Sequence, residues 1–183
     1  MKVSIIGTGY VGLVTAACFA DLGHDVTCVD IDKKKISTLK KSTIPFYEPG
    51  LKELVQKNFK SGNLNFTSSY LTGCRDADIF FICVDTPDDG TGKPNLKNLN
   101  KVIQSLSQNI KASSIVVTKS TVPLGTNDYI ANEFTKKIIN KNIKIHICSN
   151  PEFLKEGSAV QDFMRPDRII VGTDSDYVKS SMN

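Results

Sequence analysis

Three glycines near the start of the chain have the spacing that brings a backbone close to a phosphate. Gly7, Gly9 and Gly12 form a G-x-G-x-x-G motif between an apolar strand pattern and a helical pattern. In this context the first glycine permits a tight turn, the second lets a pyrophosphate approach, and the third allows close helix–strand packing. The helix amino terminus adds free N–H groups and the positive end of its dipole. Asp30 closes the next strand pattern and can accept hydrogen bonds from ribose hydroxyls, so we expect a dinucleotide site rather than an empty glycine turn.

Two threonines follow later strand patterns directly. Thr86 precedes a proline after a buried strand, and its hydroxyl can reach the diphosphate or ribose of a dinucleotide. Thr121 lies in a similar Ser-Thr-Val-Pro turn and can contact the nicotinamide or an ordered water. Each threonine has a plain structural alternative, a strand-ending turn for Thr86 and a helix cap or local turn for Thr121.

The segment Asn150–Gly157 (NPEFLKEG) gathers two carboxylates, a cation and an amide. Oxidation of an alcohol requires removal of its proton, by a base or by a carboxylate-held water. Glu152 and Glu156 are the candidates for that role, and Lys155 can meet a substrate phosphate. The alternative is surface charge, or acidic residues favoured in the first turn of a helix.

Strand and helix patterns alternate along the whole chain, which predicts an α/β fold. The pattern is that of a Rossmann-type doubly wound parallel sheet with helices on both faces and right-handed crossovers. The carboxyl ends of its strands share one edge, where ligands of such sheets bind. We expect a loop over residues 42–49, and strands at 3–6, 26–29, 64–66, 79–84, 115–118, 144–147 and 168–172. We expect helices at 13–22, 32–39, 50–59, 96–110 and 125–140.

Composition narrows the possible classes of partner. The chain has 183 residues and a net charge of +4, with lysines scattered rather than clustered with aromatic residues, so we expect no nucleic-acid partner. It has no apolar run of transmembrane length, no signal peptide and no metal-ligand cluster, so we expect no membrane, no metal and a cytoplasmic location. The five cysteines form no C-x-x-C pair and are typical of buried thiols in a reducing compartment.

Five motifs together resemble the UDP-glucose/GDP-mannose dehydrogenase family over essentially the whole chain. They are GTGYVG at 7–12, YEPGL at 47–51, KSTVPLGT at 119–126, NPEFLKEG at 150–157 and PDRIIVG at 166–172. The ending and YEPGL resemble members that act on UDP-glucose more than those that use N-acetylated UDP-sugars. The resemblance implies NAD as cofactor and oxidation of UDP-glucose at C6 to UDP-glucuronate, through an aldehyde that a cysteine thiolate traps.

Carried over by motif, the resemblance also implies roles for individual residues. Tyr10 and Val11 border the pyrophosphate turn beside the glycines, and Asp30 and Lys35 hold the adenosine ribose. Thr86, Thr121 and Glu156 contact NAD. Thr121 and Glu152 are implied as catalytic residues, and the sugar nucleotide is implied to contact Glu152, Phe153, Leu154 and Lys155.

The chain departs from the family pattern in two respects. Asp85 puts a negative charge before Thr86, where the family usually has a small or neutral residue. The family's catalytic cysteine, with its lysine and asparagine, belongs to later motifs that this sequence lacks. We therefore expect an NAD-binding domain over 1–173, the start of a linker or central helix at 174–183, and a longer protein that forms a homodimer or larger homo-oligomer. Alternatives are a GDP-mannose or UDP-N-acetylhexosamine dehydrogenase, or a non-catalytic NAD-binding module.

Overall fold

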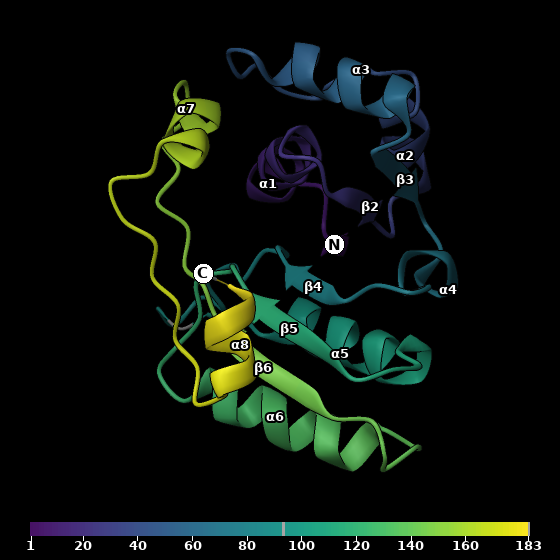
Figure 1. The fold of residues 1–183 in the computed structure, drawn as a ribbon. Coiled ribbons are helices and arrows are strands. Elements are labelled where there is room, and N and C mark those ends of the chain that lie inside the picture. The colour runs from purple at the N-terminus through teal and green to yellow at the C-terminus, as the bar shows by residue number, and fades with distance from the viewer. Residues whose placement is uncertain (93, 183) are drawn as a thin grey trace.

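The computed structural model describes residues 1–92 and 94–182, and over these ranges six strands form one parallel sheet (Figure 1). The strand order is β3-β2-β1-β4-β5-β6, with β1 at the centre. This order reverses direction beside β1, as in dinucleotide-binding folds, and confirms the predicted Rossmann-type topology. The strands are β1 (Lys2–Ile6), β2 (Asp25–Val29), β3 (Leu64–Thr67), β4 (Ile79–Ile82), β5 (Ser114–Thr118) and β6 (Ile145–Ser149).

Helices cover both faces of the sheet, with α1 and α3 on one side and α5 and α6 on the other (Figure 1). Strands β4 and β5 are buried along their whole length, because each crossover returns over a face of the sheet. The helices are α1 (Tyr10–Asp21), α2 (Lys33–Leu39), α3 (Leu51–Ser61), α4 (Tyr70–Gly73), α5 (Lys97–Asn109), α6 (Thr126–Lys137), α7 (Ala159–Met164) and α8 (Asp176–Ser181).

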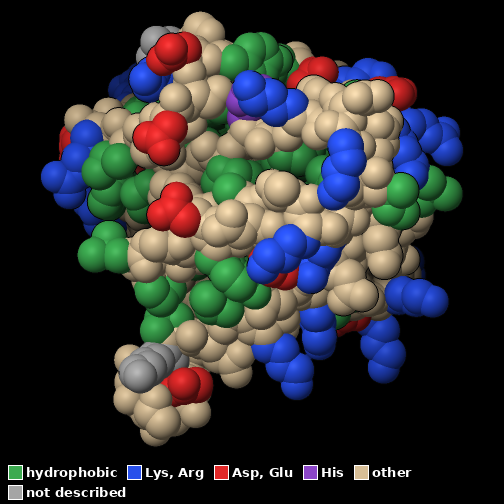
Figure 2. Space-filling model, turned by 90° about the horizontal axis from the view of Figure 1, so that it is seen from below, with side chains coloured by type: hydrophobic (Ala, Val, Ile, Leu, Met, Phe, Trp, Pro, Cys, Tyr) green, Lys and Arg blue, Asp and Glu red, His purple; other side chains and the backbone are tan. Residues whose placement is uncertain are grey.

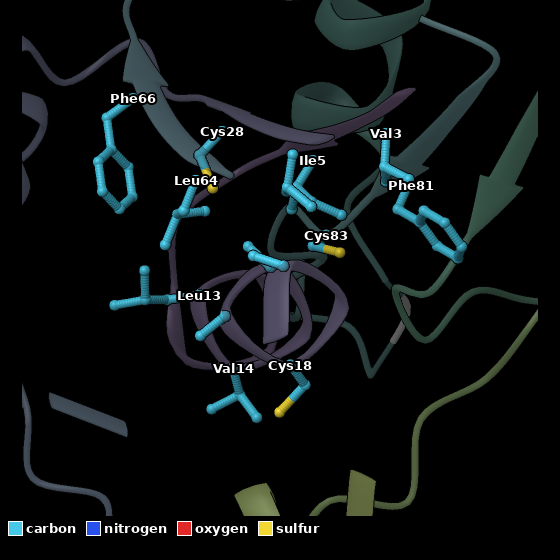
Figure 3. Packing of buried hydrophobic residues seen from close by; sticks show 14 of the residues in the cluster. Val3, Ile5, Leu13, Val14, Cys18, Cys28, Leu64, Phe66, Phe81 and Cys83 are labelled. Carbon is cyan, nitrogen blue, oxygen red and sulfur yellow. The ribbon is translucent and has the colours of Figure 1, made fainter. Parts of the chain in front are cut away.

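The larger core lies between α1 and the sheet (Figure 3). Leu13 and Val14 of α1 pack in one cluster with Ile5 of β1 and Phe81 of β4. All four side chains are almost fully buried, and each such burial stabilises the fold by roughly 1.5–3 kcal/mol. This packing fixes the start of α1 against the carboxyl end of β1.

The predicted strand over 168–172 is wrong. Gly172 pairs with Ser149 in an isolated bridge, but the residues before it form no ladder. Ile169 and Ile170 are 67% and 46% exposed, so the apolar run that suggested a strand lies on the surface. The segment instead runs beside β6 and holds it through single contacts.

Several boundaries also differ from expectation. The strand predicted over 79–84 ends at Ile82, and the helix predicted over 125–140 ends at Lys137. Helices α4 and α7 were not expected, because four and six residues are too few to show a helical period. The loop at 42–49 is confirmed. Within the predicted linker, α8 buries Val178 in the larger core, and Asn183 lies outside the described residues.

The described residues add three observations. No helix in the ranges 1–92 and 94–182 is both long and apolar enough to cross a bilayer. On the face seen in Figure 2, Lys and Arg side chains lie among acidic and apolar groups rather than merging into one basic surface. In these same ranges His, Cys, Asp and Glu form no group of three that could hold a metal ion.

Candidate functional site

The glycine turn separates the roles of its three glycines. Gly7 has a φ of +100°, and a Cβ there would lie 2.6 Å from the carbonyl oxygen of Cys83. A Cβ at Gly12 would lie 2.0 Å from the carbonyl oxygen of Gly7, so this glycine permits the close contact of α1 with the turn. Gly9, the N-cap of α1, has ordinary φ and open space where a Cβ would point. The protein thus leaves room at Gly9 for a group that approaches the helix amino terminus.

The carboxylate of Asp30 fastens this turn to the next loop. Its Oδ2 accepts hydrogen bonds from the Thr8 amide at 2.9 Å, the Thr8 hydroxyl at 2.6 Å and Lys35 Nζ at 3.0 Å. Its Oδ1 accepts one from the amide of Asp32 at 2.9 Å. Burial alone would raise the pKa of Asp30, but the bonds from Thr8, Asp32 and Lys35 lower it overall. A ribose hydroxyl would therefore share or replace a protein donor, and Lys35 stands beside it as a second polar partner.

The two threonine loops meet at the same edge of the sheet. Thr86 Oγ1 donates a hydrogen bond to the backbone oxygen of Thr121 at 2.6 Å. Ser120 Oγ donates to the backbone oxygen of Val84 at 2.6 Å, which ties the loop after β5 to the loop after β4 a second time. Thr121 itself is exposed, as is Asp85. The structure thus brings Thr86 and Thr121 together, and the hydroxyl of Thr86 forms the hydrogen bond that joins their two loops.

We call residues 150–157 the substrate loop, after the contacts that the family resemblance implies for them. The first residue of this loop is anchored in the sheet. The amide of Asn150 donates to the oxygen of Thr118 at 3.0 Å, and its Nδ2 donates to the oxygen of Ile170 at 2.8 Å. Its Oδ1 accepts from Nζ of Lys119 at 3.1 Å. Lys119 and Asn150 are 6% and 8% exposed, so a buried ammonium supports the beginning of the loop.

The middle of the substrate loop carries the expected carboxylate. Glu152 Oε2 accepts a hydrogen bond from the amide of Leu154 at 2.6 Å, which holds the side chain against its own loop. The guanidinium carbon of Arg168 lies 4.7 Å from the centre of the Phe153 ring, a cation–π contact. Phe153 is 43% exposed. The loop therefore presents an acid and an aromatic ring at the surface, and the segment before Gly172 supports them.

The end of the substrate loop meets the glycine turn. The amide of Gly157 donates to Oε2 of Glu48 at 2.8 Å, and the hydroxyl of Tyr10 donates to the same oxygen. Lys155 and Glu156 lie in the exposed stretch just before Gly157. The structure thus joins the start of α1 to the substrate loop through Glu48 of the YEPGL motif, at the edge of the sheet where the carboxyl ends of the strands meet.

A groove of about 1240 Å³ runs under the substrate loop along the sheet face beside α1. Its walls include Lys119, Asn150, Glu152 and Phe81. The described residues that line the groove do not include Gly9 or Asp30, so the groove is separate from the glycine turn.

Four residues of this site have no role in the sequence-based prediction. Thr8 and Glu48 make the buried contacts to Asp30 and Tyr10, and Lys119 and Asn150 fix the start of the substrate loop. Thr8, Lys119 and Asn150 lie inside the quoted motifs, and Glu48 lies in YEPGL. Their place in these motifs was the available sign of importance, but a motif does not show which residues each side chain contacts.

The cysteines are all free and buried. Burial raises the pKa of Cys18, Cys74 and Cys83 to about 12 and that of Cys148 to about 11, and it raises the pKa of Cys28 as well. Cys74 follows α4 in the smaller core, so its neighbour Arg75 does not make it reactive. These burial-raised pKa values keep the five thiols protonated at neutral pH.

Known proteins match the chain over nearly its whole length. It is 49% identical over 175 residues to a UDP-glucose 6-dehydrogenase of Rhizobium meliloti and 47% identical over 173 residues to one of Bacillus subtilis. These matches cover 95% and 94% of the chain but only 40% and 39% of the two relatives. The chain thus spans about two fifths of the length of these curated relatives.

Solved structures give the same picture. A UDP-glucose dehydrogenase of Pyrobaculum islandicum superposes with a TM-score of 0.94 at 34% identity, over 99% of this chain and 42% of that one. A GDP-mannose dehydrogenase of Pseudomonas aeruginosa also reaches 0.94, at 32% identity, over 100% and 43%. The model of the UDP-glucose/GDP-mannose dehydrogenase family, NAD binding domain, matches residues 1–183. Together with the open turn at Gly9, this match shows that the chain belongs to the UDP-glucose/GDP-mannose dehydrogenase family and is its NAD-binding domain.

Proposed function

We propose that the protein carrying this chain oxidises UDP-glucose at C6 to UDP-glucuronate with NAD. The observation that carries the proposal is the contact of Tyr10 and Gly157 with Glu48, because it holds the substrate loop beside the glycine turn. A carboxylate on that loop, Glu152, then lies on the same edge of the sheet as the nucleotide turn. The relatives named UDP-glucose 6-dehydrogenase add support at 47% and 49% identity.

The residues of the turn fit NAD. The open position at Gly9 and the free amides of α1 suit a pyrophosphate, which Tyr10 and Val11 would flank. Asp30 and Lys35 would hold the adenosine ribose, and Thr86, Thr121 and Glu156 would line the rest of the cofactor. Bound NAD would supply a hydride acceptor for the alcohol carbon.

The remaining chemistry falls to the substrate loop and Thr121. We assign Glu152 as the carboxylate that takes the hydroxyl proton, directly or through a water that Thr121 helps to position. Phe153, Leu154 and Lys155 would contact the sugar nucleotide, with the ammonium of Lys155 near its phosphates. These roles follow from the resemblance and from the place of the loop.

A full oxidation to the acid also needs a thiolate to trap the aldehyde. The five cysteines of this chain are buried and have raised pKa values, so none of them suits that step. The thiolate therefore belongs to another part of the protein or of its assembly. For the same protein we also propose a homo-oligomeric state and a cytoplasmic location.

GDP-mannose is the main alternative substrate, since a dehydrogenase named for it matches at 32% identity. The greater identity to the UDP-glucose enzymes favours UDP-glucose. A UDP-N-acetylhexosamine is a further alternative, and an NAD-binding module without turnover is an alternative of another class. Such a module would have no use for Glu152.

The test is NADH absorbance with the full-length protein, NAD and each nucleotide sugar in turn. We expect turnover with UDP-glucose at a kcat/KM well above that for GDP-mannose or UDP-N-acetylmannosamine. Glu152→Gln should lower kcat about 10²- to 10⁴-fold, as loss of a general base does. Glu53→Gln, an exposed carboxylate on α3, is the matched control and should change nothing. NAD binding without any turnover would favour the non-catalytic module.

A further inference from the structure

Glu48 is a buried carboxylate with no role in the function proposed above beyond its contacts. It is 4% exposed and lies in the loop between α2 and α3. This loop runs beside α7 in Figure 1, although about a hundred residues separate the two in the sequence. A buried carboxylate is costly unless hydrogen bonds offset its lost hydration, so its partners are informative.

Those partners come from two other segments of the chain. The hydroxyl of Tyr10, 38 positions away, donates to Glu48 Oε2. The amide of Gly157, 109 positions away, donates to the same oxygen at 2.8 Å. Burial alone would raise the pKa of Glu48, but the bonds from Tyr10 and from the Gly157 amide, together with the nearby amides of Val160 and Ala159, lower it overall. The group is therefore ionised at neutral pH, and its bonds are charge-assisted.

Tyr10 gives this cluster its link to the nucleotide. It directly follows Gly9 and begins α1, and its ring packs on Phe46 with ring centres 5.0 Å apart. Its hydroxyl also lies 3.5 Å from the backbone oxygen of Lys155. A single side chain thus connects the glycine turn with the loop of Glu48 and with the end of the substrate loop.

The two ends of the substrate loop are held differently. The first residue, Asn150, is fixed to β5 through Thr118 and Lys119. Near the other end, Asp162 accepts from the Lys155 amide and from the Ser158 hydroxyl, but Asp162 belongs to α7, the helix that directly follows the loop. The Glu48 carboxylate and the Tyr10 hydroxyl bonded to it are the described polar groups that tie this end to the body of the domain.

We propose that Glu48 is a positioning residue that sets the substrate loop against the nucleotide turn through Tyr10 and Gly157. It does not touch the reacting atoms. It fixes the distance between Glu152 and the glycine turn, and a small error in that distance strongly lowers the rate of the oxidation. The proposal is tested in two ways. The first measures enzyme activity and rests on the proposed function, whereas the second measures hydrogen exchange and does not.

The activity arm is a double-mutant cycle in the full-length protein with UDP-glucose and NAD. Glu48→Gln and Tyr10→Phe should each lower kcat/KM about 10- to 100-fold, the loss expected for a hydrogen bond to a charged group. The double variant should lose little more than either single one, because both changes break the same contact. In Glu48→Gln the affinity for ADP, which probes the glycine turn and Asp30, should change less than about twofold. Glu53→Gln is the control.

The second arm is amide hydrogen exchange, which needs no turnover. In Glu48→Gln and in Tyr10→Phe, exchange should become faster over residues 153–158, the Gly157 amide included, and stay unchanged in β1 and β5. If the full-length protein oxidises no nucleotide sugar, the proposed function fails, and this arm still decides the role of Glu48.

Four outcomes would overturn the proposal. They are a Glu48→Gln variant that behaves like Glu53→Gln, losses that multiply in the double variant, unchanged exchange over 153–158, and ADP affinity that falls as far as kcat/KM does. If Glu48→Gln does not fold, Tyr10→Phe keeps the carboxylate in place and tests the same contact by both arms.

Discussion

The buried ammonium of Lys119 donates a hydrogen bond to Asn150 Oδ1 at 3.1 Å, across the ends of the neighbouring strands β5 and β6. Burial lowers the pKa of Lys119, although the negative charge of Glu152 acts to raise it. The side-chain amide of Asn150 therefore supplies an acceptor for this ammonium and a donor for the backbone oxygen of Ile170. The pair fixes where the substrate loop begins.

Removal of that amide should destabilise the domain. Asn150→Ala leaves a buried ammonium without its acceptor, so we expect the free energy of unfolding to fall by about 1–3 kcal/mol. Asn63→Ala, at an exposed position before β3, should change it by less than about 0.5 kcal/mol. Denaturant unfolding of both variants measures the difference. Equal stability of the two would show that Lys119 finds another partner at no cost.

The glycine turn predicts opposite results at two of its positions. Gly9→Val should abolish NAD binding and keep the fold, because its side chain enters space that the protein leaves open. Gly12→Ala should disturb the fold itself, since its Cβ would lie 2.0 Å from the Gly7 oxygen. Calorimetry with NAD, together with thermal unfolding, separates the two effects. An unfolded Gly9→Val or a fully stable Gly12→Ala would contradict this account.

The chain should bind NAD in preference to NADP. A 2′-phosphate would meet the carboxylate of Asp30, and like charges at close range repel. Lys35 lies 3.0 Å from that carboxylate and offsets part of the repulsion, while Lys33 and Lys34 are exposed. Calorimetry with both cofactors tests the preference, and equal or tighter NADP binding would contradict it. Asp30→Asn should reduce the difference in affinity between NAD and NADP.

Acid should weaken the domain partly through Asp30. Its pKa in the folded chain lies below the ordinary 3.8, so the unfolded chain binds the proton more readily. The stability that this group contributes is therefore complete above pH 3.8 and is lost as the pH falls from there through its folded pKa. Denaturant midpoints between about pH 6 and pH 3 should drop for the wild type and drop less for Asp30→Asn. Parallel curves would exclude this role.

Residues 1–183 alone should bind NAD without oxidising UDP-glucose. The glycine turn, Asp30, Thr86 and Thr121 are present for NAD. For the sugar, however, Glu152 and residues 153–155 supply only one wall of the proposed site, and the buried cysteines cannot supply the thiolate of the second step. NADH absorbance at saturating UDP-glucose and NAD, with the full-length protein as positive control, tests this. If the 183-residue chain turns over, Cys74→Ser is the first variant to make.

The sequence by itself determined the fold class and the nucleotide turn, because both depend on local patterns. Buried parallel strands read as short apolar runs, and the three glycines lie close together between β1 and α1. Gly7 and Gly12 are glycines for the reasons their spacing predicted, as their close contacts show. The roles assigned to Thr121, Glu152 and Glu156 stay predictions.

Only the tertiary structure decided how the site is held together. The contact of Glu48 with Gly157 joins residues 109 positions apart, and no periodicity along the chain encodes such a pair. The strand predicted over 168–172 is wrong for the same reason, because the sequence does not show which partner a segment pairs with. Only Gly172 of this apolar run pairs with β6, through an isolated bridge to Ser149. A local sequence pattern indicates which residues can be buried. Only long-range packing determines which polar groups the buried residues contact.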